Sequence, residues 1–254
     1  MKMQSTTMTA RQPDGVALAT AVLTKITVMA TEADETRLIA RMANTQKPIS
    51  ACFVNQHTLI LALRSSHFAR RLLDSDILLR DGIGVELCLA ALGRSPGRNM
   101  CGTDVIPRIA LAFAGRRTAL FGTEEPWLSK AAAILAESGC EIVARMDGFR
   151  PGPEYVAEVC RTRPDLIILA MGSPKQETVS SMIASSIVTP AAIVNGGAIA
   201  DMLAGRFERA PLWLRRARGE WLFRLLQEPK RLWRRYLLGG VVFAWYLMRL
   251  RIAS

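Results

Sequence analysis

The sequence predicts an α/β protein, with an open, mostly parallel, Rossmann-like sheet, helices on both of its faces and a helical basic C-terminal appendage. Short apolar runs alternate along the chain with amphipathic segments, which is the pattern of βαβ units. Of the 254 residues, 50% are hydrophobic and 22% are charged, a balance that supports a large buried core and excludes a disordered chain. After Gly205 the sequence becomes rich in Arg and Trp and loses the strand pattern.

The short apolar runs are the predicted strands. In chain order they are Ile26–Met29, Ala51–Val54, Ile77–Leu79, Thr118–Phe121, Glu141–Ala144, Leu166–Ala170 and Ala192–Val194. Two of the segments between them, Pro126–Glu137 and Pro153–Cys160, begin with proline, which favours the first position of a helix. We expect a flexible N-terminal tail over residues 1–20, an α/β catalytic core over 21–205 and the appendage over 206–254.

The positive charge of the chain is concentrated in the predicted appendage. The formal net charge is +11, and residues 206–254 hold eleven Arg and one Lys against three Glu. Such a local excess indicates an acidic partner. The longest apolar stretch, Tyr236–Met248, has thirteen residues and is interrupted by Gly239–Gly240. Because a spanning helix needs about 20 apolar residues, we expect this stretch to lie on a bilayer without crossing it.

Other features narrow the location and the chemistry. The polar N-terminus lacks the apolar run of a secretory signal, which predicts a cytoplasmic protein. The five cysteines are scattered without a Cys-x-x-Cys pair, so we expect free thiols and no zinc site. Asp74-Ser75-Asp76 resembles a metal-binding Asp-x-Asp, but it precedes a strand, at the wrong end of the sheet. His57 and His67 lie ten residues apart in one predicted helical region, and we expect neither a metal ion nor a cofactor.

Ligands of an open α/β sheet bind beyond the carboxyl ends of the strands. The polar and glycine residues at those ends are Asn55, Asp81–Gly82, Gly122–Thr123, Asp147–Gly148, Gly172–Ser173 and Asn195–Gly197. Backbone N–H groups at such turns favour an anionic ligand such as a diphosphate. The dinucleotide pattern G-x-G-x-x-G and the P-loop pattern are both absent from the sequence, which disfavours nicotinamide chemistry and P-loop hydrolysis.

Asp81 is the strongest candidate for an acid or base. It ends a predicted buried strand, where partial desolvation raises the pKa of a carboxyl group and suits it to act as a general base. The alternative is that Asp81 caps the predicted helix Ile83–Leu92. The segment Ser173–Glu177 also has two interpretations. Spacing favours a helix cap, with Ser173 as the cap and Gln176 completing a capping box. In the other interpretation Lys175 and Gln176 stand beside the ligand.

The appendage combines basic and apolar side chains on helical segments. In a helix starting at Pro229, three arginines share one side, and apolar residues flank them: Arg231, Arg234 and Arg235 with Leu232, Trp233 and Tyr236. This pattern suits an interfacial helix on anionic lipid. Guanidinium groups also clamp diphosphates in a forked geometry. A solvated charged face and nucleic-acid binding are the alternatives.

A set of motifs in consistent order carries a resemblance to a known family. They are Asp81–Val85, Gly102–Asp104, Gly172–Glu177, Ala204–Gly205 with Arg209–Trp213, and Glu220–Pro229. Together they resemble the WecG/TagA/CpsF glycosyltransferases (family 26) over roughly residues 30–240. The resemblance implies inverting, metal-independent transfer of a hexose or N-acetylhexosamine-type sugar from a UDP-sugar to a polyprenyl (undecaprenyl) diphosphate-linked sugar. It places the enzyme peripherally on the inner face of the cell membrane, in surface or exopolysaccharide biosynthesis.

The resemblance also assigns roles to residues. The general base of the family falls on Asp81, its conserved glutamine on Gln176, and its diphosphate-binding arginines on Arg224, Arg231 and Arg234. Asn55 belongs to a Thr-x-Asn motif whose threonine is replaced here by Phe53, and this replacement bears on the sugar that is accepted. We expect catalysis from Asp81, Asn55 and Gln176. The predicted substrate-binding residues are Gly82, Thr103, Asp104, Gly122, Gly172, Lys175, Asp201, Arg224, Arg231 and Arg234.

Two other classes of function share parts of this pattern. A basic nucleic-acid-binding protein would also use an Arg- and Trp-rich appendage, and a nucleotide-dependent oxidoreductase would share the α/β core. The expected partners are a UDP-sugar, the lipid-linked sugar acceptor and an anionic membrane surface, without nucleic acid. The sequence is also compatible with an oligomer.

Overall fold

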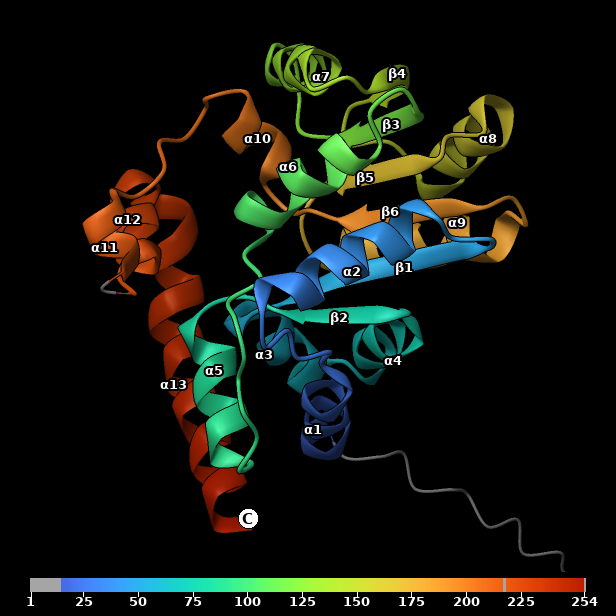
Figure 1. The fold of residues 1–254 in the computed structure, drawn as a ribbon. Helices are drawn as coiled ribbons and strands as arrows, with labels where there is room; N and C mark the ends of the chain where they lie inside the picture. Colours follow the sequence, from blue (N-terminus) through green and yellow to red (C-terminus); the bar gives the residue numbers. More distant parts are fainter. Residues whose placement is uncertain (1–14, 217, 254) are drawn as a thin grey trace, which may run out of the picture.

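The computed structural model describes residues 15–253 apart from residue 217, and it leaves out the side chains of residues 216, 231, 235, 236 and 253. Within these residues, six parallel strands form one sheet in the order β2-β1-β6-β5-β3-β4 (Figure 1). The strands are β1 (Pro48–Val54), β2 (Ile77–Arg80), β3 (Arg117–Gly122), β4 (Glu141–Met146), β5 (Leu166–Ala170) and β6 (Ala191–Asn195). The predicted parallel α/β sheet is confirmed.

One predicted strand is wrong. The run Ile26–Met29 forms no strand, although Thr27 N–H donates a single hydrogen bond of 2.8 Å to Leu78 O of the edge strand β2. The guanidinium of Arg94 instead binds the carbonyls at the end of the preceding helix, including Leu23 O at 2.7 Å and Thr24 O at 2.9 Å. Ile26 and Met29 are apolar because they are buried in the core, and burial alone does not distinguish a strand from an extended loop.

Helices cover both faces of the sheet, as the sequence predicts. Their bounds are α1 (Gly15–Lys25), α2 (Glu32–Ala43), α3 (Gln56–Arg64), α4 (Ser66–Asp74), α5 (Ile83–Ala91), α6 (Gly102–Ala112), α7 (Trp127–Glu137), α8 (Gly152–Thr162), α9 (Lys175–Ser186), α10 (Ile199–Leu203), α11 (Leu212–Arg216), α12 (Glu220–Gln227) and α13 (Pro229–Ala253). Ser65 separates α3 from α4 and caps α4, its side chain accepting from Phe68 N–H at 3.2 Å. The predicted helical region that holds His57 and His67 is therefore two helices.

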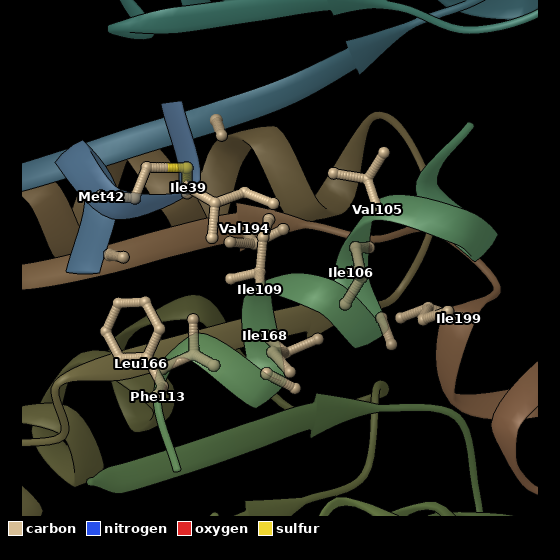
Figure 2. Close-up of a cluster of buried hydrophobic side chains, with 14 of the residues drawn as sticks. Ile39, Met42, Val105, Ile106, Ile109, Phe113, Leu166, Ile168, Val194 and Ile199 are labelled. Carbon is tan, nitrogen blue, oxygen red and sulfur yellow. The ribbon is translucent and has the colours of Figure 1, made fainter. Parts of the chain in front are cut away.

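Alternation along the strands divides the core between the two faces. In β5, Leu166 and Ile168 point into a cluster with α2 and α6, and Ile167 points to the opposite face. Figure 2 shows the first cluster, where side chains of α2 and α6 meet those of β5 and β6. On the other face α8 and α9 cover β3, β5 and β6, and a third cluster joins α1, α3, α4, α5 and α13 over β1 and β2.

The C-terminal helix α13 belongs partly to the core. Phe243, Tyr246 and Leu250 are buried in the cluster that contains α1, α3 and α5, and Tyr246 Oη lies 3.1 Å from Thr20 Oγ1. Figure 1 shows α13 running alongside α5, with α11 and α12 next to its N-terminal end. No helix among the described residues is long and apolar enough to cross a membrane.

These contacts bear on the predicted N-terminal tail and on the predicted C-terminal appendage. Of the predicted N-terminal tail, residues 1–14 lie outside the described residues, and residues 15–20 belong to α1, in which Leu18 and Ala19 are buried. The appendage over residues 206–254 is helical in most of its described part, but its last helix fills a face of the core. Removal of the whole appendage would therefore expose buried apolar side chains of α1, α3 and α5.

Replacing a buried aromatic residue of α13 tests this packing. We expect Tyr246→Ala to lower the free energy of unfolding by about 3–5 kcal/mol, because it leaves a cavity between α13 and α1 and removes the contact with Thr20. Urea denaturation measures this loss. Trp245→Ala is the matched control, since the Trp245 side chain is exposed and its loss should change the stability by less than about 1 kcal/mol. Equal effects of the two substitutions would show that α13 is not anchored by this face.

Candidate active site

A cavity of about 490 Å³ lies beyond the carboxyl ends of β1, β2, β5 and β6. Its walls come from the segments that follow these strands, from the first turns of α3, α5 and α6, and from α12 and α13. This is the position at which open α/β sheets bind their ligands. The ionisable side chains that line it include Asp81, Glu220, Arg224 and His57. The cavity therefore combines residues of the sheet with residues of the appendage.

Asp81 lies at the end of β2 and faces this cavity. Its backbone N–H donates to Val54 O at 2.8 Å, and its carboxylate accepts hydrogen bonds from the Asn55 side chain and the Cys101 thiol. Burial raises the pKa of Asp81 above its ordinary value, and the negative charge of Glu220 adds to this shift. The positive charge of Arg224 and the two hydrogen bonds oppose it. A half-buried carboxyl group with a raised pKa is suited to accept a proton.

The alternative role for Asp81, as a helix cap, is wrong. Gly82 precedes α5 with φ +85°, and no side chain caps this helix. Gly82 N–H donates to Asn99 Oδ1 at 2.8 Å. The Asp81 carboxyl group is therefore not occupied by the backbone of α5.

Asn55 holds Asp81 and the first turn of α3 together. Its Oδ1 accepts from His57 N–H at 3.0 Å and from Thr58 N–H at 3.2 Å, while Thr58 Oγ1 accepts from Asn55 N–H at 2.8 Å in a capping box. Because Oδ1 is engaged by the helix, the amide nitrogen is the atom that donates to Asp81. The helix cap thus fixes the orientation of the group that positions the carboxylate.

Gln176 connects the segments after β5 and β6. Its Oε1 accepts from Gly172 N–H at 3.2 Å and from Gly197 N–H at 2.9 Å, and the side chain is 5% exposed. The predicted cap at Ser173 is wrong, since Pro174 precedes α9 without a side-chain cap and Ser173 Oγ donates to Glu177 Oε1 at 2.6 Å. Spacing fits a capping box, but the buried carboxylate of Glu177 takes the serine hydroxyl instead.

Glu177 is a buried acid directly beneath this junction. It is 3% exposed, and its Oε1 also accepts from Gln176 Nε2 at 3.0 Å. Among the described residues its Oε2 has no hydrogen-bond partner, and neither has Oδ1 of the buried Asn195. Burial raises the pKa of Glu177, with hydrogen bonds from Ser173 and Gln176 opposing the shift. Burial therefore favours the neutral form of this side chain.

Several predicted substrate-binding residues do not line the cavity. Lys175 Nζ donates to Gly148 O at 2.7 Å and to Arg150 O at 2.8 Å. Gly122 packs against the backbone of Ala170, and Asp201 accepts from Thr123 Oγ1. The guanidinium of Arg234 lies 5.3 Å from the centre of the Trp233 ring. Arg231 belongs to α13, but its side chain lies outside the described part of the structure.

Asp104, also predicted to bind substrate, joins the appendage to the core. It forms ion pairs with Arg209 and Arg215 of the appendage.

Other ion pairs also join the appendage to the core. Arg218 of the appendage binds Glu86 of α5 at 2.8 Å, and Glu86 binds the buried Arg80 at 3.0 Å. A further pair of contacts joins Arg206 to Asp201 at 3.3 Å and to Glu124 at 3.1 Å. These ion pairs hold Arg206, Arg209, Arg215 and Arg218 against the core.

The cavity brings together seven of the predicted site residues: Asp81, Asn55, Gln176, Gly82, Thr103, Gly172 and Arg224. It also contains residues that were not in the predicted site, among them Gln56, His57, Cys101, Ser173, Asn195–Ile199, Met202, Glu220, Trp221, Leu232 and Phe243. Asn195–Gly197 carried the signal of a polar strand end. Glu220 carried a signal only as the first residue of the motif Glu220–Pro229, because it comes to the cavity only when the appendage packs against the core. Phe53, in place of the family threonine, also lines the cavity.

Comparison with known proteins identifies a family and relatives to which this chain is similar. A family model described as "Glycosyl transferase WecG/TagA/CpsF family" matches residues 21–254. Two curated relatives, from Bacillus spizizenii and Bacillus subtilis, are 27% identical over 186 and 190 residues. The matches cover 69% and 72% of this chain and 70% and 73% of the relatives. Each relative is named N-acetylglucosaminyldiphosphoundecaprenol N-acetyl-beta-D-mannosaminyltransferase.

The buried Glu177 predicts a specific pH dependence of stability. Below the unfolded pKa of about 4.3 the acid is neutral in both states. As the pH rises from there through the raised folded pKa, the unfolded chain releases its proton first, so the free energy of unfolding falls. We expect Glu177→Gln to flatten this decline in urea denaturation between pH 4 and pH 8. Glu158→Gln is the control, because the pKa of Glu158 is lowered by Arg161 and shifts in the opposite direction. An unchanged slope in Glu177→Gln would contradict the prediction.

Proposed function

Because the chain belongs to the WecG/TagA/CpsF glycosyltransferase family, it is a glycosyltransferase, and we propose that it moves a hexose or N-acetylhexosamine-type sugar from a UDP-sugar to a polyprenyl (undecaprenyl) diphosphate-linked sugar. The names of the two relatives support this class of acceptor. The observation that carries the proposal is the half-buried Asp81, whose pKa is raised, beside Arg224 in one cavity. The product would enter bacterial surface or exopolysaccharide biosynthesis. Membership in this family favours a glycosyltransferase over the oxidoreductase and nucleic-acid-binding alternatives.

The proposed reaction is a single displacement at the anomeric carbon. Asp81 accepts the proton of an acceptor hydroxyl, whose oxygen forms the new bond to the anomeric carbon as the bond to the UDP oxygen breaks. Attack from the face opposite UDP inverts the configuration. Asn55 orients the Asp81 carboxylate, and Gln176 holds the segments after β5 and β6 in place. UDP leaves with the electron pair of the broken bond.

We propose that arginine side chains stabilise the negative charge that develops on the leaving diphosphate. Arg224 of α12 lines the cavity, and a guanidinium group can meet two phosphate oxygens at once. The strand-end N–H groups of Gly82, Gly172 and Gly197 are less available than the sequence suggests, because each already donates to a side chain. Arg231 and Arg234 remain candidates for the same role by their position in the appendage. The proposal requires no metal ion.

The outer face of α13 supports attachment to a membrane surface. Val241, Trp245, Met248 and Ile252 are exposed and follow helical spacing on the side opposite the buried Tyr246. Exposed basic residues accompany them on the same helix, namely Lys230, Arg234, Arg249 and Arg251. An apolar helix face with basic residues beside it suits an anionic bilayer. We propose that the enzyme is peripheral on the inner face of the cell membrane, where the lipid-linked acceptor is presented.

Asp81→Asn tests the proposed base. Turnover should fall by a factor of about 10²–10⁴, since the amide cannot accept the proton of the acceptor hydroxyl. The assay supplies UDP-glucose, UDP-N-acetylglucosamine or UDP-N-acetylmannosamine with a polyprenyl-diphosphate-linked sugar, and the configuration of the product is determined. UDP binding, measured by calorimetry, should be kept. Asp165→Asn, outside the cavity, is the control. Turnover near the wild-type rate would remove Asp81 from this role, and a retained configuration would refute single displacement.

Membrane attachment is tested by vesicle flotation. The double variant Trp245→Ser/Met248→Ser should bind vesicles of anionic phosphatidylglycerol at least about ten-fold more weakly, because two apolar side chains no longer enter the interface. Phe149→Ser/Val188→Ser is the matched control, since both residues are exposed apolar side chains outside the appendage. Equal loss in the two double variants, or no loss in the first, would contradict attachment through α13.

A further inference from the structure

The appendage brings a negative charge into the cavity as well as a positive one. Glu220 and Arg224 are four residues apart on α12, so they share one face of the helix, and both line the cavity. Leu222 and Leu226 are exposed on α12. The diphosphate of a sugar donor explains an arginine at this position. It does not explain a carboxylate, which would repel the same ligand.

Glu220 interacts electrostatically with several groups around the proposed base. Its charge acts on Asp81, on the Cys101 thiol and on Arg209. For Asp81 it is the second-largest influence after burial, and it raises the pKa of that carboxyl group. The interaction joins two segments far apart in the sequence, the end of β2 and the start of α12. The coupling therefore exists only while α12 lies over the cavity.

From this cluster we propose that Glu220 is a positioning residue for the transfer reaction, brought by the appendage to strengthen Asp81 as a base. This inference rests on the proposed function, in which Asp81 accepts the proton of the acceptor hydroxyl. Nearby like charge favours the neutral form of Asp81, so the ionised form binds a proton more readily. The appendage thus supplies Arg224 to the donor and Glu220 to the base from one helix face. Docking of the appendage then controls both halves of the site.

The other groups around Asp81 act in other directions. Arg224 on α12 lowers its pKa, and so do the hydrogen bonds from Asn55 and Cys101. Arg80, the preceding residue in β2, is paired with Glu86. His57 of α3 lines the same cavity. Of the groups that act on Asp81, Glu220 is the one whose negative charge comes from the appendage.

Position at the start of α12 offers a simpler role for Glu220. An acid in the first turn of a helix interacts favourably with the helix dipole. That role would change the stability of α12 and leave the titration of Asp81 where it was. A measurement of the Asp81 titration therefore separates the two roles.

The test compares the full-length wild type with Glu220→Gln. The acid limb of the pH profile of kcat/KM should move to lower pH by about one unit, because removal of the negative charge lets Asp81 lose its proton more easily. The plateau rate should fall roughly three-fold, since a less basic carboxylate accepts the proton less readily. Glu220→Asp keeps the charge and should restore the acid limb. Glu208→Gln removes an exposed acid of the appendage outside the cavity and should leave the profile unchanged.

A second readout keeps this inference separate from the proposed function. Carboxyl ¹³C NMR can follow the titration of Asp81 directly, without turnover, and it should show the same shift in Glu220→Gln. If Asp81→Asn keeps its activity, the proposed base fails, while the NMR shift still decides whether Glu220 acts on Asp81. If Asp81→Asn is inactive but the acid limb and the NMR titration stay in place in Glu220→Gln, the role of Glu220 is refuted. An equal shift in Glu208→Gln would also refute it. If Glu220→Gln does not fold, the position of the acid limb in Glu220→Asp decides instead, and a shifted limb there counts against the proposal.

Discussion

The packing of α13 against α1, α3 and α5 is the contact on which the site depends. Tyr246 is fully buried there, and Phe243 is buried while also lining the cavity. Because α12 packs against α13, this hydrophobic anchor determines where Glu220 and Arg224 stand. The ion pairs of Arg209 and Arg218 add to the anchor at the surface, where each contributes little by itself. A glycosyltransferase site whose charged residues come from two parts of the chain needs such a connection, since neither part contains the whole site.

Buried polar contacts give the sheet side of the cavity its rigidity. Asn55 caps α3 and holds Asp81, while Gln176 ties the segments after β5 and β6 to each other. Each of these amides has its oxygen engaged by backbone N–H groups, so the orientation of the side chain is fixed before a ligand binds. The consequence is that several strand-end N–H groups are already occupied. A diphosphate donor would then depend on arginine side chains of the appendage to neutralise its negative charge. Binding of the donor would therefore depend on the docking of α12.

The exposed face of α13 relates the packing of the appendage to the proposed attachment to a membrane. One face of the helix is buried in the core, and the opposite face exposes Trp245 and Met248. An enzyme that works on a lipid-linked acceptor benefits when one helix both contacts the bilayer and carries the core packing that places the catalytic appendage. In the proposed function, the basic charge of the chain would serve two anionic partners, the lipid surface and the donor diphosphate. Glu220 instead brings a negative charge to the cavity, and we propose that this charge strengthens Asp81 as a base.

Local patterns in the sequence determined the elements of this protein, and long-range packing decided how they form a site. Seven strands were predicted and six of them form, because alternation and apolar runs depend on neighbouring residues. Strand-end polarity pointed to Asp81 and Asn55, and the family resemblance pointed to Gln176. The same logic failed for Ile26–Met29, where a side chain from elsewhere in the chain binds the carbonyls before the run, and for Ser173, where buried Glu177 takes the hydroxyl. Tertiary structure alone decided that Asp104 and Lys175 bind protein groups, that Tyr246 is buried in the core, and that Glu220 lines the same cavity as Asp81. Each of these outcomes depends on contacts between residues distant in sequence, which no local period or motif encodes.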